Sequence, residues 1–272
     1  MPFFDHEGLK FHYRDEGSGI PFVFQHGLGA ELSQPFSLLR PPAGIRLIAF
    51  DCRAHGQTHP LGDVNKLGLH TFADDLYALL AFLQIKDAIV GGISMGAAVT
   101  LNFALRHPEM VRGLVLSRPA WTDKPHPWNV HIFTLISRLI DEHGPMGGQQ
   151  VFRETPEYRE AAQKWPDVAR SLLGQFESPS VEETFCKFTR IIQDRPCDDL
   201  RQLATIRVPT LVLANDQDPI HPLEFGPILA RAIPNGQFRQ ITSKSVSVER
   251  HEREVQDALE QFLREHFIER AW

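Results

Sequence analysis

The sequence of 272 residues has little cysteine, no long apolar run and no excess of basic charge, and each shortage excludes a class of protein. Its cysteines, Cys52, Cys186 and Cys197, are an odd number without a Cys-x-x-Cys pair, which argues against a disulfide framework and a zinc site. No stretch approaches the ~18 consecutive apolar residues of a membrane span. The N-terminus has neither the basic nor the apolar region of a signal peptide. We therefore expect a cytoplasmic protein with no metal and no membrane partner.

Charge and composition narrow the class further. The formal net charge of −6 at pH 7 argues against nucleic acid or an anionic membrane as a partner. Hydrophobic residues make up 42% and charged residues 23%, as in ordinary soluble globular proteins. A chain of this length can bury one large core, or a core and an insertion. The sequence leaves the oligomeric state open.

The chain is organised around the stretch from Asp87 to Ala104. There an apolar, β-rich run ends in Gly92-Ile-Ser94-Met-Gly96, and an alanine-rich helical pattern begins at once. Gly-x-Ser-x-Gly between a strand and a helix is the context of a nucleophile elbow. A serine on so sharp a turn has a strained backbone, and a side chain at either glycine would collide with the neighbouring strand or helix. The other interpretation is a tight turn whose serine only caps the helix.

Short strands alternate with helical stretches on both sides of this elbow, which predicts a mostly parallel sheet covered on both faces. We expect strands at residues 9–14, 20–25, 45–50, 111–116, 208–214 and 237–242, and one that leads into Ser94. We expect helices at 72–83, after Ser94 to about 107, at 223–232 and at 249–266, and Thr71 as the N-cap of the first.

The alternation stops at Arg118-Pro119. From Trp121 to about Asp199 there is no strand pattern, and prolines separate short helical patterns at 130–142, 156–164 and 181–193. We interpret residues 120–199 as a helical cap inserted into a core of residues 1–119 and 200–272. A separate helical domain is the alternative, but the many aromatic residues favour a lid packed over a pocket.

Four motifs fall in order on these elements: His26-Gly27 after an early strand, Asp51-x-Arg-x-His55-Gly after the next, the elbow at Ser94, and Asp218-Pro after a late strand. This order resembles the α/β-hydrolase fold superfamily over essentially the whole chain. The resemblance implies a hydrolase of small ester or acyl substrates that needs no cofactor.

The resemblance also implies roles for individual residues. Ser94 takes the position of the nucleophile, and the main-chain N–H groups of Leu28 and Met95 match the two oxyanion donors. Asp218 aligns with the acid, and Asp216 is the alternative. A serine hydroxyl is a weak nucleophile near neutral pH, so it also needs an adjacent base. His26 in this motif usually braces its loop, and binding of substrate is its other possible role.

The base is where the pattern departs from the family. The family places a histidine in the loop after the last strand, about five residues before a glutamate that opens the final helix. Counting back from Glu249 leads to Lys244, and counting forward from the strand leads to Ser245 or Val246, so neither count gives a histidine. The nearest histidine, His251, lies inside the predicted final helix.

Three interpretations of the base remain open. In the first, Lys244 is the base, which requires a neutral amine, although a neighbouring Asp218 would favour the ammonium form. In the second, another histidine takes the role: His221 near the acid, or His126, His131 or His143 of the cap. In the third, base catalysis is lost, and a cationic Lys244 beside the oxyanion hole binds or transforms an anionic small molecule.

Arg118 bears on the same question, because it follows a strand end that normally faces the pocket. It is either a substrate-binding residue or part of a salt bridge that braces its loop. The sequence therefore predicts a serine hydrolase with an atypical base, with Ser94, Asp218 and Lys244 as catalytic residues. His26, Arg118 and His221 are the possible substrate-binding residues.

Overall fold

One eight-stranded sheet forms the centre of the computed structural model, which describes residues 2–269. The strand order is β1-β2-β4-β3-β5-β6-β7-β8. β1 pairs with β2 and β2 with β4 in antiparallel fashion, whereas the other neighbours are parallel, so the predicted mostly parallel sheet is confirmed. The strands are β1 Phe3–His6, β2 Leu9–Gly17, β3 Gly19–Gln25, β4 Gly44–Phe50, β5 Ala88–Ile93, β6 Val111–Ser117, β7 Thr210–Ala214 and β8 Gly236–Gln240.

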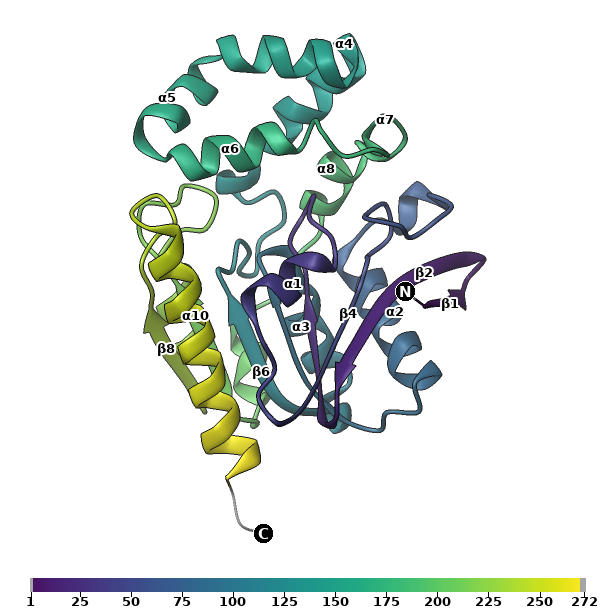
Figure 1. Cartoon of the computed structure of the whole chain (residues 1–272), viewed down its shortest axis with the longest axis vertical. Helices are drawn as coiled ribbons and strands as arrows, with labels where there is room; N and C mark the ends of the chain where they lie inside the picture. Colours follow the sequence, from purple (N-terminus) through teal and green to yellow (C-terminus); the bar gives the residue numbers. More distant parts are fainter. Residues whose placement is uncertain (1, 270–272) are drawn as a thin grey trace.

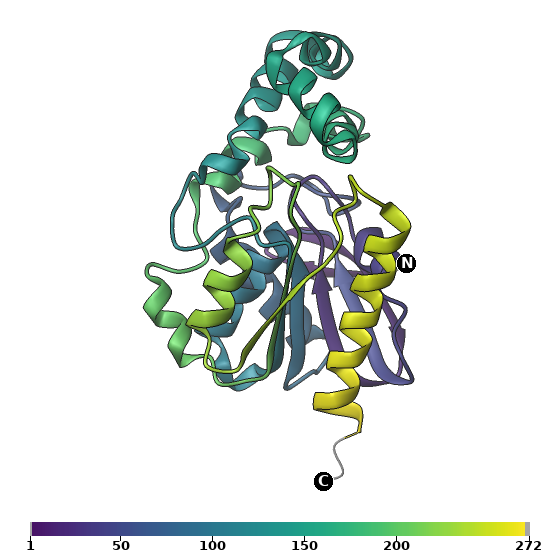
Figure 2. The same cartoon turned by 90° about the vertical axis from the view of Figure 1, so that its left-hand side faces the viewer.

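Helices cover both faces of this sheet, as its buried apolar strands require. α2, α3 and α9 pack on one face and α1 and α10 on the other, and each face has its own hydrophobic cluster. Figure 2 shows α10, in yellow, on one side of the strands and α9, in light green, on the opposite side. The bounds are α1 Ser33–Leu38, α2 Leu69–Phe82, α3 Met95–Arg106, α9 Phe225–Ala232 and α10 Val248–Leu263, and a π-helical turn, Arg264–Ile268, follows α10.

Residues 120–199, which we call the cap segment, form helices between β6 and β7 and contain no strand within the described chain. In Figure 1 these helices, in teal and green, lie above one end of the sheet. The helix predicted at 156–164 is confirmed, that at 181–193 is broken into short pieces, and α6 was not predicted. The helices are α4 Ile132–Glu154, α5 Pro156–Lys164, α6 Pro166–Gly174, α7 Val181–Thr184 and α8 Lys187–Arg190.

The predicted N-cap of α2 is wrong. The helix begins at Leu69, so Thr71 lies inside its first turn, and the N-cap position is Gly68, whose lack of a side chain leaves it nothing to cap with. The carboxylate of Asp194, from the cap segment, accepts the N–H of His70 at 3.2 Å instead. A contact from more than a hundred residues along the chain thus replaces the local cap.

No helix within the described residues is long and apolar enough to cross a bilayer.

Candidate active site

The predicted nucleophile elbow lies where β5 meets α3. Ser94, between them, has a backbone φ of 56° and ψ of −110°, and its N–H donates to the Ser117 carbonyl at 2.9 Å. A Cβ on Gly92 would lie 2.2 Å from the carbonyl carbon of Gly96, and one on Gly96 would lie 2.5 Å from the carbonyl oxygen of Gln25. Side chains there would collide with α3 and with β3, which confirms the predicted need for both glycines.

The strained serine does not cap α3. Although Ser94 occupies the N-cap position, its side chain makes no capping hydrogen bond to the described helix. A non-glycine residue at positive φ costs about 1–3 kcal/mol and is typical of functional sites. Ser94 is 9% exposed and lines a cavity of about 250 Å³. The geometry therefore favours the elbow over the simple turn.

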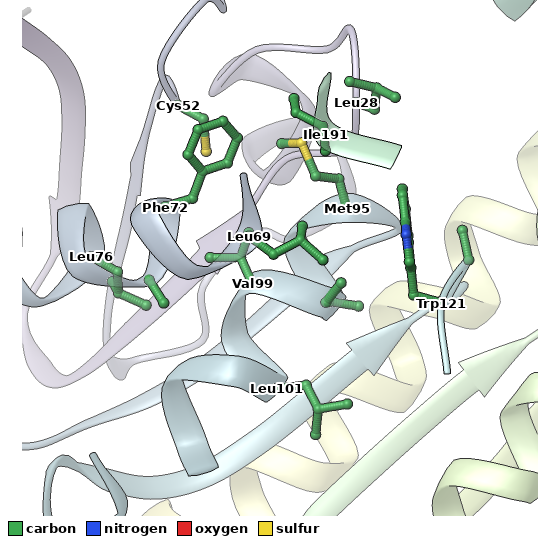
Figure 3. Close-up of a cluster of buried hydrophobic side chains, with 14 of the residues drawn as sticks. Leu28, Cys52, Leu69, Phe72, Leu76, Met95, Val99, Leu101, Trp121 and Ile191 are labelled. Carbon is green, nitrogen blue, oxygen red and sulfur yellow. The ribbon is translucent and has the colours of Figure 1, made fainter. Parts of the chain in front are cut away.

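The two predicted oxyanion donors are the N–H groups of Leu28, in the loop after β3, and of Met95, the first residue of α3. Figure 3 shows both side chains in a buried hydrophobic cluster, which leaves their main chain for the site. The first N–H groups of a helix have no partner within it, and no acceptor within residues 2–269 takes a hydrogen bond from the Leu28 N–H. Gln34 braces this loop by accepting the N–H of Gly27 at 2.8 Å.

His26 is fully buried beside the same loop and does not line the cavity. Its Nδ1 lies 2.8 Å from the Gly27 carbonyl oxygen, and its Nε2 accepts the N–H of Cys52 at 3.0 Å. Burial lowers the pKa of His26, which keeps the ring neutral in this role. This placement fits the loop-bracing alternative rather than contact with substrate.

Six of the eight predicted site residues, all within the described range, line the one cavity of about 250 Å³. They follow β3, β5, β6, β7 and β8, because the carboxyl ends of parallel strands meet at one edge of a sheet. The six are Leu28, Ser94, Arg118, Asp218, His221 and Lys244, and the two that do not line it are His26 and Met95.

Asp218 pairs with Arg118 rather than with a residue of the last loop. Nη2 of Arg118 donates to Oδ2 of Asp218 at 2.6 Å, and Nδ1 of His221 lies 2.9 Å from the same oxygen. The other carboxylate oxygen accepts the N–H groups of Ile220 and His221 at 3.1 and 3.2 Å. Arg118 thus braces the loop after β7 and lines the cavity as well.

These contacts determine the charge states of Asp218 and His221. Burial alone would raise the pKa of Asp218, but His221 and Arg118 reverse this and hold that pKa well below its usual range. Burial, reinforced by the charge of Arg118 and opposed by Asp218, lowers the pKa of His221. Near neutral pH, Asp218 is therefore ionised and His221 is neutral.

Lys244 lies in the loop after β8, half-buried at the cavity. Within the described part of the chain, no carboxylate lies at ion-pair distance from its amine, and Asp218 is already paired with Arg118. Burial, and then the positive charge of Arg118, lower the pKa of Lys244 below its ordinary value of 10.5. The amine is therefore closer to its neutral form than a solvated lysine would be.

The other groups considered as acid or base lie away from the cavity. His126, His131 and His143 of the cap segment are exposed, and none of them lines it. His251 is buried in α10, where its Nδ1 lies 2.8 Å from the Thr242 carbonyl oxygen and burial lowers its pKa to about 4. Asp216, the alternative acid, is exposed and does not line the cavity either.

Sequence reasoning missed the cavity residues that the cap segment supplies. α6 contributes Asp167 and Arg170, together with its C-cap residue Gln175, and α4 contributes Phe133. The aromatic content of the segment was the available signal, but it did not separate Phe133 from aromatic residues that pack elsewhere. Trp121, Phe152 and Phe176 belong to the same hydrophobic cluster as Phe133 but do not line the cavity.

Comparisons with known proteins agree with this architecture. A family model described as alpha/beta hydrolase fold matches residues 20–245. The chain is 27% identical over 245 residues to the AB hydrolase superfamily protein YisY of Bacillus subtilis (strain 168), with 85% of this chain and 87% of that protein covered. It is 28% identical over 246 residues to the non-heme chloroperoxidase CPO-A1 of Kitasatospora aureofaciens, with 86% and 87% covered.

Among solved structures, a thermophilic esterase from Thermogutta terrifontis is similar with a TM-score of 0.74 and 24% identity, and 97% of each chain is covered. This likeness concerns the fold. The curated relatives include both a hydrolase-superfamily protein and a chloroperoxidase, so they do not name a substrate. The predicted fold class is confirmed.

Proposed function

The chain belongs to the alpha/beta hydrolase fold family, and we propose that it hydrolyses small carboxylic esters with Ser94 as nucleophile and Lys244 as base. The observation that carries the proposal is a half-buried lysine amine, free of a carboxylate partner among the described residues, that lines the same cavity as the elbow serine. The cavity of about 250 Å³ is below the ~300–1,000 Å³ of common ligand pockets, which favours small substrates.

Arg118 removes the objection to a lysine base. A lysine beside an ionised aspartate would be held as ammonium, which cannot accept a proton. Here the Arg118 guanidinium satisfies the Asp218 carboxylate at 2.6 Å, and its charge lowers the pKa of Lys244 in addition to burial. Asp218 thus acts through Arg118, as the counter-ion that holds this guanidinium in place.

The reaction would proceed in two halves. In the first, the neutral amine of Lys244 accepts the proton of Ser94 Oγ while that oxygen attacks the ester carbonyl carbon. The carbonyl oxygen becomes an oxyanion, which the N–H groups of Leu28 and Met95 stabilise. The lysine then gives its proton to the departing alcohol, and an acyl-serine remains.

In the second half, water replaces the alcohol. Lys244 accepts a proton from the water as its oxygen attacks the acyl carbon, and the same two N–H groups hold the oxyanion. Collapse breaks the bond to Ser94 Oγ, which regains its proton from the lysine. The carboxylic acid leaves, and serine and amine return to their starting states.

His221 is the competing base within the same function. Its Nδ1 is 2.9 Å from Asp218 Oδ2 and 3.1 Å from Nη2 of Arg118, and only with the proton assigned to Nδ1 would Nε2 be the accepting atom. Its lowered pKa keeps the ring neutral, as a base requires. Arg118 draws on the same carboxylate oxygen, however, so the aspartate would stabilise an imidazolium less than in an isolated pair.

Binding or conversion of an anionic small molecule is the second candidate function. Arg118, Arg170 and Lys244 line the cavity against two carboxylates, Asp167 and Asp218, which leaves an excess of one positive charge while Lys244 is protonated. An ammonium beside two oxyanion donors would hold a carboxylate or an enolate. In this case Ser94 would position the ligand without becoming acylated.

A serine-reactive fluorophosphonate separates acylation from mere binding. The wild type should be labelled, and Ser94→Ala should lose the label. Ser171→Ala is the matched control, because this serine lines the same cavity but is exposed on α6, so its label should persist. A folded wild-type protein that takes no label would exclude the esterase and leave the anion-binding function.

Substitution at the two bases then assigns the proton acceptor. With Lys244 as base, Lys244→Met and Lys244→Arg should each reduce kcat for a small aryl ester by about 10²–10⁴-fold. The arginine variant keeps the charge but cannot be deprotonated. His221→Gln should then reduce kcat far less. The reverse order would assign the role to His221, and Lys244→His would test whether an imidazole works at the lysine position.

A further inference from the structure

A second cavity, of about 310 Å³, is lined by the cap segment and by Pro219 and Ile220 of the core. Val168, Leu172 and Ile220 line both cavities. Because the same three side chains face the site on one side and the second cavity on the other, the partition between the two spaces is one side chain thick. It is made jointly by the cap segment and the core.

The partition is built from packed apolar side chains. Val168 and Leu172 are four residues apart on α6, so they lie on the same face of that helix. Ile220 comes from the loop after β7, two residues beyond Asp218. The three side chains are 6%, 4% and 9% exposed, in that order. Three buried, branched residues therefore stand between the site cavity and the second cavity.

The two spaces differ in chemistry. The site cavity holds the serine, the lysine and the arginine–aspartate pair. Apolar side chains dominate the walls of the second cavity, including Ile132, Leu135 and Trp165. An apolar acyl chain that crossed the partition would pass from the polar site cavity into the second cavity, where its methylene groups would be buried. Joining them would more than double the space open to a ligand.

We propose that Leu172, supported by Val168 and Ile220, determines the acyl-chain length that the enzyme accepts. With the partition closed, the acyl group is confined to the site cavity, so short-chain esters are the substrates. With Leu172 shortened, the acyl chain extends into the second cavity. This inference rests on the proposed esterase function, and it adds a substrate class and the residue that limits it.

Acyl-chain length is tested with p-nitrophenyl esters from acetate to decanoate. The wild type should prefer acetate and butanoate, with kcat/KM falling steeply for longer chains. Leu172→Ala should raise the octanoate-to-acetate ratio of kcat/KM at least about tenfold, since each newly buried methylene contributes about fourfold. Leu173→Ala is the matched control, because Leu173 is the next residue, is also a buried leucine, and lines neither cavity. Its ratio should stay at the wild-type value.

Refilling the second cavity should reverse the gain. Ala161 is buried on α5 and lines the second cavity but not the first. The double variant Leu172→Ala/Ala161→Phe should therefore return the octanoate-to-acetate ratio to that of the wild type. Leu172→Val removes less volume and should give a smaller shift in the same direction, which keeps the test open where the alanine variant folds poorly.

A binding measurement separates failure of this inference from failure of the esterase proposal. Calorimetric titration of Ser94→Ala with n-alkyl carboxylates from acetate to decanoate needs no turnover. In this background Leu172→Ala should tighten binding of octanoate relative to acetate, whereas Leu173→Ala should not. A shift in binding without any ester hydrolysis would support the partition and exclude the esterase. Unchanged chain-length preference in both kinetics and binding would overturn the role of Leu172.

Discussion

Two non-glycine residues with positive φ follow neighbouring strands of the sheet: Ser94 after β5, with φ of 56°, and Arg118 after β6, with φ of 48°. Each such residue costs about 1–3 kcal/mol, which the rest of the fold must offset. The strain at Ser94 accompanies a hydroxyl at the cavity. At Arg118 it accompanies a guanidinium that reaches the carboxylate of the next strand's loop. Of the seven non-glycine residues with positive φ in the described chain, these two line the site cavity.

Replacing Arg118 by methionine should move the pH profile of the enzyme. The charge of Arg118 lowers the pKa of Lys244, and its guanidinium occupies Asp218. Without it, the pKa of Lys244 rises, so the neutral amine appears only at higher pH. The rising limb of kcat/KM against pH should therefore shift to higher pH in Arg118→Met. Loss of one partner of a buried pair should also destabilise the fold by about 3 kcal/mol.

The control for this prediction is Arg170→Met. Arg170 lines the same cavity but forms its ion pair with Asp167, at 3.9 Å. Removing Arg170 should leave the rising limb of kcat/KM at the same pH, and it should cost little stability because Arg170 is exposed. An unchanged limb in Arg118→Met would mean that Lys244 is not the titrating base.

The elbow glycines make a separate prediction about stability. A Cβ on Gly92 would lie 2.2 Å from main-chain atoms of Gly96, which cannot move without displacing α3 from the sheet. Gly92→Ala should therefore lower the free energy of unfolding by at least about 2 kcal/mol. Gly174→Ala, where a Cβ meets nothing within 4 Å, should be neutral or mildly stabilising. Urea denaturation of both variants checks this, and equal stabilities would contradict it.

At the scale of elements, the helix boundaries that could be predicted are those determined by neighbouring residues in the sequence. α5 is delimited locally, because the Thr155 side chain accepts the N–H of Tyr158 and Pro156 begins the helix. The start of α2 could not be predicted, since the group that satisfies its N-terminus is Asp194, brought there by the tertiary fold. The core half of the site follows from strand ends and motifs, so Ser94 and its neighbours were predictable.

The half of the site on α6 has no such signal. Gln175 meets the loop after β3 so closely that a Cβ on Gly29 would lie 1.6 Å from its Oε1. Nothing in the spacing of these two residues indicates the contact, because it exists only once the cap segment has docked. The spacing does not indicate the pairing of Arg118 with Asp218 either, because these residues are a hundred positions apart and meet only when the loops after β6 and β7 come together. Both are products of packing rather than of local pattern.

α8 supplies a prediction about docking of the cap segment. Lys187 is 2% exposed, and its amine donates to the Ala54 carbonyl oxygen of the core at 2.8 Å and contacts Thr184 Oγ1 at 3.1 Å. Burial lowers its pKa from 10.5 to about 8. The folded state therefore binds this proton less tightly than the unfolded state does. Stability from this group is lost as the pH falls through 8 and is regained as the pH rises toward 10.5.

Wild type and Lys187→Met should differ accordingly in urea denaturation. Between pH 8 and pH 10.5, the free energy of unfolding of the wild type should rise relative to that of the variant by about 3 kcal/mol. Other groups that titrate in this range are common to both proteins and cancel in the difference. Lys164→Met, which removes an exposed lysine paired with Glu160, should track the wild type. A constant difference between wild type and Lys187→Met would contradict a buried, weakly basic amine.

At the scale of the whole molecule, the cap segment and the core share one hydrophobic cluster. Trp121, Phe133 and Ile191 of the segment belong to the same cluster as Met95 and other residues of the core. Figure 3 shows Trp121 and Ile191 in one cluster with Leu28 and Met95. The packing that holds the segment is thus continuous with the packing behind the elbow. We therefore expect segment and core to unfold together, although their division at residues 120–199 remains a prediction.

The tryptophans make this testable without an added label. Trp121, Trp128 and Trp165 all lie in the cap segment, and Trp121 is 1% exposed. The fourth, Trp272, lies outside the described residues, so Trp272→Phe gives a protein whose tryptophan fluorescence reports the segment alone. Its urea transition should coincide with that of far-UV circular dichroism, which reports all helices and strands. A fluorescence transition at lower urea would mean that the segment detaches first, and that the wall of Leu172 and Ile220 opens in a still-folded core.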